Sequence, residues 1–184
     1  MLHGWHELLR DARRFARDRS AGPASEFAIV APVVIAVILA TLQAGIIFVG
    51  KAYLETGAEQ AARTVLTNNA TTTTGGVTSP MTQAQFQAAV CAQLPALFTC
   101  GGLIVELEPL PSGTTSVATL TPQFKNDGTL ANPVSYQTGT SGQLMFLLVA
   151  YQWPVYGGIL GLNFGTLGNG TLLMTSTQIF KIEI

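Results

Sequence analysis

The sequence predicts an α+β protein in which one long amino-terminal helix crosses a membrane and continues into a small exported domain. Three observations predict this fold class. Residues 27–50 carry no charge, the segment after them keeps a helical period, and three strand-like runs lie in the second half of the chain. The exported domain is expected to hold a short second helix and a sheet of about three or four strands.

The first element is the run from Phe27 to Gly50, which holds 24 residues without a charged side chain. As a helix it is about 36 Å long, enough to cross a hydrocarbon core of about 30 Å with some tilt. A secretory signal peptide has an apolar region of about 7–15 residues followed by a small-residue cleavage site. The run therefore predicts a retained single-pass anchor.

The charges that flank this run predict its orientation. Lys51 and Arg63 follow it, whereas five arginines precede it: Arg10, Arg13, Arg14, Arg17 and Arg19. Positive residues next to a span favour the cytoplasmic side. Residues 1–25 are therefore expected to form a cytoplasmic basic leader, and the chain beyond Gly50 is expected to be exported.

Beyond the membrane, apolar residues step by four, three and four positions along one helical face: Leu54, Ala58, Ala61 and Val65. The span and its extension are thus predicted to form one helix, residues 26–69. A Thr-rich tract with Gly75 and Gly76 follows and predicts a flexible joint. Thr82 is then a favourable N-cap for a second helix, residues 82–94, which Pro95 ends.

Residues 70–184 are expected to form one extracytoplasmic α+β domain. Residues 103–108, 144–153 and 172–184 are predicted strands, and the middle run is apolar on both faces, as a central strand is. The Thr-, Ser-, Gly- and Pro-rich stretch at 111–143 is longer than most loops. It is expected to hold an edge hairpin or to be a mobile surface arm, and a contact with an outside partner could lie there.

A second membrane span is the alternative for residues 144–162, which are also free of charge. Gln152, Trp153 and Pro154, and then the Gly157–Gly158 pair, interrupt this run. A lipid-facing helix there would bury a poorly satisfied amide and a broken hydrogen-bond ladder. The strand interpretation is therefore favoured.

Cys91 and Cys100 are the only cysteines, and both lie on the exported side, where disulfides form. A structural disulfide between them is expected. A redox or metal pair is the alternative, but the spacing is not that of a CxxC motif, and no histidine or further cysteine lies nearby.

Composition excludes several classes of function. The net charge is −1 and charged residues make up 10% of the chain, so no basic face is available for nucleic acid. The two histidines, His3 and His6, precede the span, so an exported Ser–His or Cys–His site is not expected. The chain is expected to be neither an enzyme nor the holder of a cofactor or metal.

Two other groups of side chains allow a functional and a structural interpretation. Glu106 and Glu108 share one strand face and could serve as paired carboxylates or bind a hard metal ion, but a solvated strand face is favoured. Tyr151, Trp153 and Tyr156 could form a stacking platform, although packing around the central strand is favoured.

Four pieces of the first 63 residues together carry a resemblance to a known family. They are ASEFAIVAP at residues 24–32, Gly45, YLE at residues 53–55 and AEQAAR at residues 58–63. Together they resemble the amino-terminal signature of TadE-like proteins, the pseudopilins or minor pilins of the tight-adherence (Tad, type IVc) pilus system. The LLVAYQWPVYGGILG and LLMTSTQIFKIEI segments near the end, and the cysteine pair, are also similar to that family.

The resemblance implies a pilin-like layout in the bacterial inner membrane, with the carboxy-terminal domain periplasmic or extracellular. It implies that the helix packs against other pilins and pseudopilins, meets the pilus assembly platform and can be incorporated into the fibre. Glu26, followed by Phe27, would then neutralise a neighbour's amino terminus. Four residues would permit close helix packing: Ala28, Ala31, Pro32 and Gly45.

The resemblance also implies a prepilin peptidase as a partner, and here the sequence departs from the family. In the family, four residues usually lie between the glycine that precedes the cut and the Glu-aromatic pair, but only three residues lie between Gly22 and Glu26. A cut after Gly22 would leave Pro23 as the first residue, whereas a cut between Ala21 and Gly22 would place alanine before the scissile bond. Both remain candidate processing sites beside an uncleaved leader.

Two functional hypotheses follow. The first is a minor pilin or pseudopilin that acts in pilus assembly or initiation and in surface adhesion. The second is a membrane-anchored extracytoplasmic binding or sensory module that does not enter a pilus. Glu26 distinguishes them, because a carboxylate at the edge of an isolated anchor would simply lie among lipid headgroups.

Overall fold

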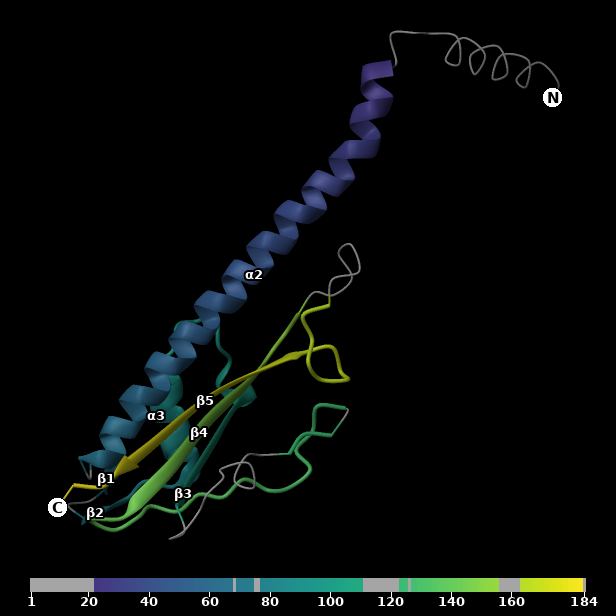
Figure 1. Cartoon of the computed structure of the whole chain (residues 1–184). Helices are drawn as coiled ribbons and strands as arrows, with labels where there is room; N and C mark the ends of the chain where they lie inside the picture. Colours follow the sequence, from purple (N-terminus) through teal and green to yellow (C-terminus); the bar gives the residue numbers. More distant parts are fainter. Residues whose placement is uncertain are drawn as a thin grey trace, which may run out of the picture. The chain divides into compact units, whose positions relative to one another are not determined.

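The computed structural model describes residues 22–67, 69–74, 77–110, 123–125, 127–155 and 163–183. Helix α2 is followed along the chain by strands β1 and β2, helix α3, the 3-10 helix η2 and strands β3, β4 and β5 (Figure 1). The chain divides into two compact units, Met1–Leu42 and Gln43–Ile184. Its long helix, short helix and two sheets confirm the predicted α+β class.

Helix α2 spans Gly22–Leu66, and Pro32 lies inside it without ending it. The prediction of one continuous helix is confirmed, although the helix begins and ends a few residues earlier than predicted. At its end, the Thr67 N–H donates to the Arg63 carbonyl at 3.0 Å and the Asn69 N–H to the Thr64 carbonyl at 2.9 Å. These bonds satisfy carbonyls that a helix end otherwise leaves without partners.

The amino-terminal part of α2 exposes an almost continuous apolar surface, which includes Phe27 at 73% and Ile29 at 74% exposure. Over its most apolar 18 residues the mean hydropathy is 2.5, and 11% of that window is buried. Within the described ranges, α2 is the one helix long and apolar enough to cross a membrane. So large an apolar surface needs lipid or another protein to cover it.

The tract after α2 holds two strands that were not predicted. Thr71–Thr74 (β1) and Val77–Pro80 (β2) form a two-stranded antiparallel sheet, whereas Gly75 and Gly76, the predicted joint, lie outside the described residues. The Thr73 and Thr78 hydroxyls are paired across it at 3.0 Å. The prediction gave weight to the polarity of the threonines, whereas their β-branching favours the extended conformation.

Helix α3 spans Gln83–Cys91 and begins, as predicted, directly after Thr82. A capping box fixes this start, because the Thr82 hydroxyl accepts from the Gln85 N–H while the Gln85 side chain accepts from the Thr82 N–H. The helix ends before the predicted Leu94, since Gln93 and Leu94 donate in tighter turns to the Val90 and Cys91 carbonyls.

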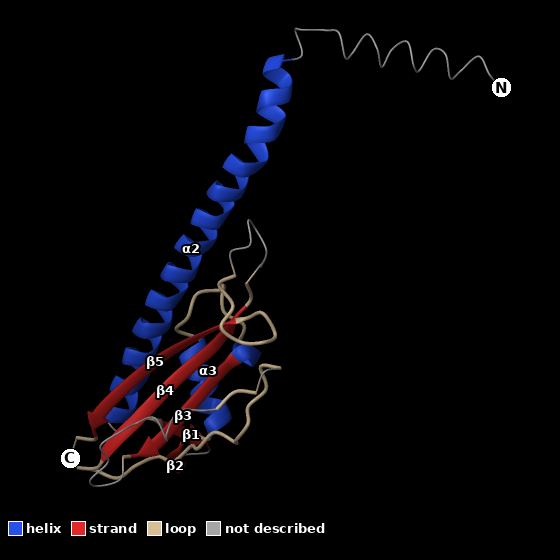
Figure 2. Cartoon of the chain, turned by 45° about the vertical axis from the view of Figure 1, so that its right-hand side comes forward, coloured by secondary structure: helices blue, strands red, loops and turns tan. Residues whose placement is uncertain are grey.

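The main sheet contains β3 (Leu103–Pro109), β4 (Leu144–Trp153) and β5 (Leu172–Lys181). It is antiparallel in the order β3-β4-β5, so the doubly apolar run is the central strand, as predicted (Figure 2). Because residues 144–153 form β4, the alternative of a membrane helix from residue 144 is wrong. Residues 156–162 of that alternative lie outside the described residues.

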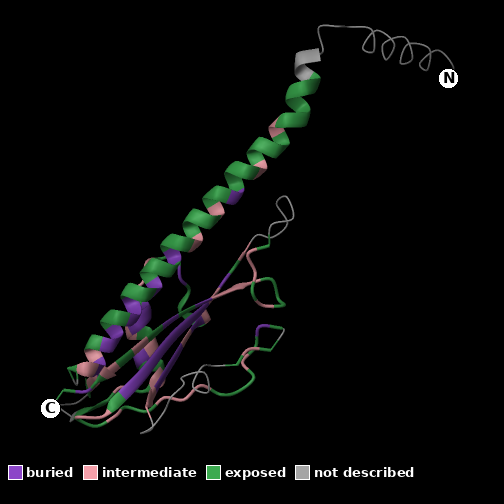
Figure 3. Cartoon of the chain, in the orientation of Figure 1, coloured by how far each residue is buried: buried purple, intermediate pink, exposed green. Residues whose placement is uncertain are grey.

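The carboxy-terminal part of α2 and helix α3 pack on the same face of this sheet. The predicted helical face is buried there, with Leu54 and Ala58 at 0% exposure, Ala61 at 1% and Val65 at 3% (Figure 3). Phe86 and Val90 of α3 join the same core, together with alternate residues of all three strands.

Part of the 111–143 stretch lies along the outer edge of β3. The Leu107 N–H donates to the Ser135 carbonyl at 3.1 Å, and the Gln137 N–H donates to the Leu107 carbonyl at 2.7 Å. The Tyr136 hydroxyl donates to the Met81 carbonyl at 3.1 Å. This part therefore covers a sheet edge, and residues 111–122 of the predicted hairpin or arm lie outside the described residues.

The other face of the sheet carries the two glutamates of β3. Glu106 is 7% exposed and lies opposite Leu148 in the register, while the half-buried Glu108 lies opposite Phe146. The expectation of a solvated strand face is therefore wrong for Glu106. The apolar residues of β4 on this face are fully buried, which shows that the face is covered.

The two carboxylates are poorly satisfied. Glu106 Oε1 accepts from the Ser135 N–H at 3.2 Å, but Glu106 Oε2 and Glu108 Oε1 are buried without a hydrogen-bond partner among the described residues. Burial raises the pKa of Glu106, the nearby Glu108 charge adds to the increase, and the Ser135 hydrogen bond opposes it.

Replacing Gly50 tests the contact between α2 and β4. A Cβ at Gly50 would lie 3.1 Å from the Trp153 ring, whereas one at Gly45 would meet nothing within 4 Å. We expect Gly50→Leu to displace the ring and to lower the free energy of unfolding by about 1–3 kcal/mol. Gly45→Leu is the matched control and should cause no loss. Equal unfolding curves for both variants in detergent micelles, followed by circular dichroism, would contradict this contact.

Stability against pH tests the burial of Glu106. The pKa of Glu106 in the folded protein lies above the ordinary value of 4.5. The side chain therefore makes its full contribution to stability below pH 4.5, and this contribution is lost as the pH rises through the folded pKa. The melting temperature of Glu106→Gln, relative to that of the native chain, should therefore rise as the pH increases from about 4.5 to 7. Glu55→Gln, at an exposed helix position, is the control. If the melting temperatures of the native chain and of Glu106→Gln change in parallel with pH, the burial of the Glu106 carboxylate is refuted.

Candidate assembly helix and the adjoining domain

Glu26 and Phe27 lie in the second turn of α2 and are exposed. No ion pair or hydrogen bond joins Glu26 to another described residue. The carboxylate is therefore open to a group from another chain, although its role as an assembly contact stays a prediction. Of the candidate processing residues, Gly22 and Pro23 begin α2 and Ala21 lies outside the described residues.

The small residues predicted for helix packing are accessible on α2. Ala28, Pro32 and Gly45 are exposed and Ala31 is half-buried, and a Cβ added at Gly45 would meet no heavy atom within 4 Å. Small side chains let two helix backbones approach closely in lipid, where dispersion contacts drive association. Their accessibility permits packing against another helix, and such packing stays a prediction.

The carboxy-terminal half of α2 carries a row of charges spaced by four residues: Lys51, Glu55, Glu59 and Arg63. Arg63 Nη2 lies 2.7 Å from Glu59 Oε1, with both side chains mostly exposed. A pair of this kind contributes at most about 1 kcal/mol. The charged row therefore contributes little to the stability of the fold.

Beside this row, a polar hollow of about 530 Å³ lies between α2 and β5, lined on the helix by Lys51, Glu55 and Glu59 and on the strand by residues 175–178. Strand β5 is an edge strand of the sheet. This hollow could not be predicted from the sequence, because no sequence pattern indicates that β5 lies beside the charged row.

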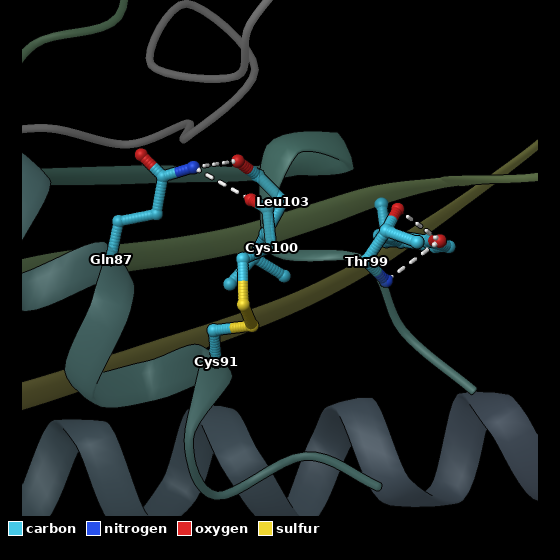
Figure 4. Close-up of a disulfide and its surroundings, with 6 residues drawn as sticks. Gln87, Cys91, Thr99, Cys100 and Leu103 are labelled. Carbon is cyan, nitrogen blue, oxygen red and sulfur yellow. Dashed lines mark hydrogen bonds between the residues drawn. A yellow bond between two sulfur atoms is a disulfide. The ribbon is translucent and has the colours of Figure 1, made fainter. Parts of the chain in front are cut away.

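The predicted disulfide is confirmed. Cys91 at the end of α3 is bonded to Cys100 in η2 (Cys100–Gly102), with Cα atoms 5.5 Å apart (Figure 4). Gln87 Nε2 donates to the Cys100 and Leu103 carbonyls at 3.1 and 2.6 Å, which ties α3 to the start of β3 as well. The cysteine pair is thus structural, and the redox or metal alternative is not favoured.

The aromatic residues of β4 are packed and do not form an open platform. Tyr151 and Trp153 are 4% and 8% exposed, and Phe98 lies edge-on to them at centroid distances of 4.9 and 5.5 Å. The Tyr151 hydroxyl also accepts from the Thr99 N–H at 3.2 Å. Packing is therefore the better interpretation for these two residues, and Tyr156 lies outside the described residues.

The described side chains offer no group of three His, Cys, Asp or Glu residues that could hold a metal ion. Glu106 and Glu108 come from one strand, and the charged row on α2 is spread along a helix. The described residues instead form a long apolar helix with the exposed carboxylate of Glu26 near its start, followed by a small domain that contains a disulfide.

Comparison with known proteins agrees with this layout at its amino-terminal end. Searches of curated proteins and of solved structures found no match. A family model described as TadE-like protein matches residues 24–63, which lie within α2 and include Glu26, Gly45 and the charged row. The match confirms the resemblance of the long helix to TadE-like proteins.

Proposed function

We propose that the protein is a minor pilin or pseudopilin of a Tad-type pilus, which acts in pilus assembly or initiation and so supports surface adhesion. Its α2 helix is anchored in the bacterial inner membrane with residues 1–25 in the cytoplasm, and residues 70–184 form the extracytoplasmic domain. Its partners are other pilins and pseudopilins, the pilus assembly platform and a prepilin peptidase. The role is non-catalytic.

The observation that carries the proposal is the joint presence, on one helix, of the family match and an exposed apolar surface with small residues. A lone anchor needs only hydrophobic length. A subunit that packs beside other helices also benefits from surfaces that allow close approach, and Ala28 and Gly45 provide them.

Glu26 supplies the second support. A carboxylate and an ammonium group 4 Å apart attract by about 4 kcal/mol where the effective dielectric constant is near 20, against about 1 kcal/mol in water. Within a bundle of helices, such a pair would align a new subunit with its neighbour, because a shift along the axis would leave two charges unpaired in an apolar medium.

The alternative function, a membrane-anchored binding or sensory module outside any pilus, is favoured by one feature. The polar hollow between α2 and β5 offers charged and hydroxyl groups at a sheet edge, as a site for a small polar ligand or peptide would. On this alternative Glu26 has no partner subunit, so substitutions at that position separate the two functions.

Glu26→Lys is expected to abolish pilus function in cells, because it would place two positive charges together at the proposed subunit contact. Glu55→Lys is the matched control, since it makes the same charge change on the exposed exported part of the same helix, and it should leave pili in place. The measurement is the number of pili per cell by electron microscopy, with membrane levels of each variant checked by immunoblot. Normal piliation in cells that lack the whole protein would refute the proposal.

Processing is tested by mass spectrometry of the amino-terminal peptide of the protein purified from its native membrane. Incorporation into the fibre predicts a new terminus at Gly22 or at Pro23, which would lie four or three residues before Glu26 and provide the amino group for a neighbour. A terminus at Met1 or Leu2 would instead leave a fixed anchor that acts at the base of the machine or outside it altogether, and would refute incorporation.

A further inference from the structure

The two edges of the main sheet differ in how their backbone groups are satisfied. On the β3 edge, Gln87 Nε2 donates to the Leu103 carbonyl at 2.6 Å. One helical turn earlier, Gln83 Nε2 donates to the Val105 carbonyl at 3.3 Å. The N–H and the carbonyl of Leu107 are both bonded to the chain segment that covers the rest of this edge. The β3 edge is therefore closed to another strand.

The β5 edge has no such cover among the described residues. One residue beyond the β4–β5 ladder, and in its register, the Ile182 N–H donates to the Gln143 carbonyl at 3.0 Å. Hydrogen bonding alternates along an antiparallel strand, so the even-numbered residues of β5 bond to β4. The N–H and carbonyl groups of Thr175 and Thr177 therefore point away from the sheet, and no other described residue bonds to them.

The polar hollow between α2 and β5 opens onto these free backbone groups. Residues 175–178 form its strand side, the charged row on α2 forms its helix side, and its volume is about 530 Å³. Thr175 and Thr177 are exposed. Paired strands lie about 4.8 Å apart and rise about 3.3 Å per residue. The hollow thus has room for a few residues of one added strand, whose alternate side chains would face α2.

The charges in the hollow indicate what such a strand carries. Two carboxylates, Glu55 and Glu59, line it together with one ammonium group, that of Lys51. Glu59 is already paired with Arg63. Glu55 is exposed and forms no ion pair with another described residue. A cationic side chain on the added strand would therefore meet Glu55, while small hydroxyl side chains would suit the threonines of the edge.

A second copy of this chain does not supply such a strand. Strands β1 and β2, and β5 from Leu172 to Phe180, have no charged side chain, so they would bring no cation to Glu55. Strand β3 has a closed edge and carries Glu106 and Glu108, whose charge has the same sign as the carboxylates of the hollow. The strand that fits the hollow therefore comes from another protein.

We propose that the β5 edge binds an extended segment of another protein, which adds to the main sheet as a further strand and presents a lysine or arginine to Glu55. Main-chain hydrogen bonds to Thr175 and Thr177 supply the affinity, and the side chains in the hollow select the sequence. The inference does not depend on the proposed pilus role, because it uses none of the residues proposed for packing of α2 against other pilins.

The test uses the synthetic peptide acetyl-TVKVTV-amide, labelled with a fluorophore and added to the full chain in detergent micelles. Fluorescence anisotropy measures binding. Thr177→Pro removes one outward N–H and no hydrogen bond to β4, so the affinity should fall about tenfold. Thr177→Val keeps the N–H and is the matched control, which should bind as the native chain does. Equal affinities for the two variants, or no binding by the native chain at millimolar peptide, would overturn the proposal.

A second peptide tests the charge. Acetyl-TVEVTV-amide, with glutamate in place of lysine, should bind the native chain about threefold more weakly, and Glu55→Lys should reverse this preference. A preference for the lysine peptide that is the same in both chains would contradict the contact with Glu55. In cells, Glu55→Lys should still leave pili in place, so a failure of strand addition is distinguished from a failure of the proposed function.

Amide hydrogen exchange in the native chain gives a readout that needs no substitution. The TVKVTV peptide should slow exchange at Thr175 and Thr177 and leave exchange at Leu107, on the closed β3 edge, unchanged. Unchanged exchange at both threonines would refute strand addition. A dimer of the native chain that Thr177→Pro dissociates would also overturn the proposal, with a second copy as the occupant of the edge.

Discussion

The packing of the alanine-rich face of α2 on the main sheet is the contact on which the rest of the structure depends. Leu54, Ala58, Ala61 and Val65 are nearly inaccessible to solvent, and they form one side of a core whose other side is the sheet. Alanine has a high helix propensity and a small side chain. The same helix thus has a candidate membrane span at one end and forms part of the core of a small domain at the other.

Much of this arrangement could be predicted from the sequence because strong local signals agree with it. A charge-free run, a helical stripe, the Thr82 cap and a doubly apolar strand each have one dominant interpretation, and the structure follows them. The β1–β2 hairpin was missed because four consecutive threonines are polar by composition but extended by stereochemistry. Glu106 was misjudged because burial of its face depends on chain segments far away in sequence.

The candidate site could be predicted only in part, for the same physical reason. Glu26 and the small residues of α2 belong to one local motif, so a sequence match can identify them. The hollow beside β5 arises where residues 51–59 of α2 meet residues 175–178 of β5, far apart in the sequence. Single-sequence patterns report neighbours along one element, whereas contacts of that kind depend on strand order and on the side of the sheet that each helix covers.

The strand order also has a consequence for biogenesis. The central strand β4 is hydrogen-bonded on one side to β3, which precedes it in the chain, and on the other to β5, which follows it. The Cys91–Cys100 loop can close early because its contacts are local, but pairing with β5 has high contact order. The alanine face of α2 therefore lacks its complete sheet until β5 has been synthesised. Folding of the domain is thus completed later than the formation of the helix on which it packs.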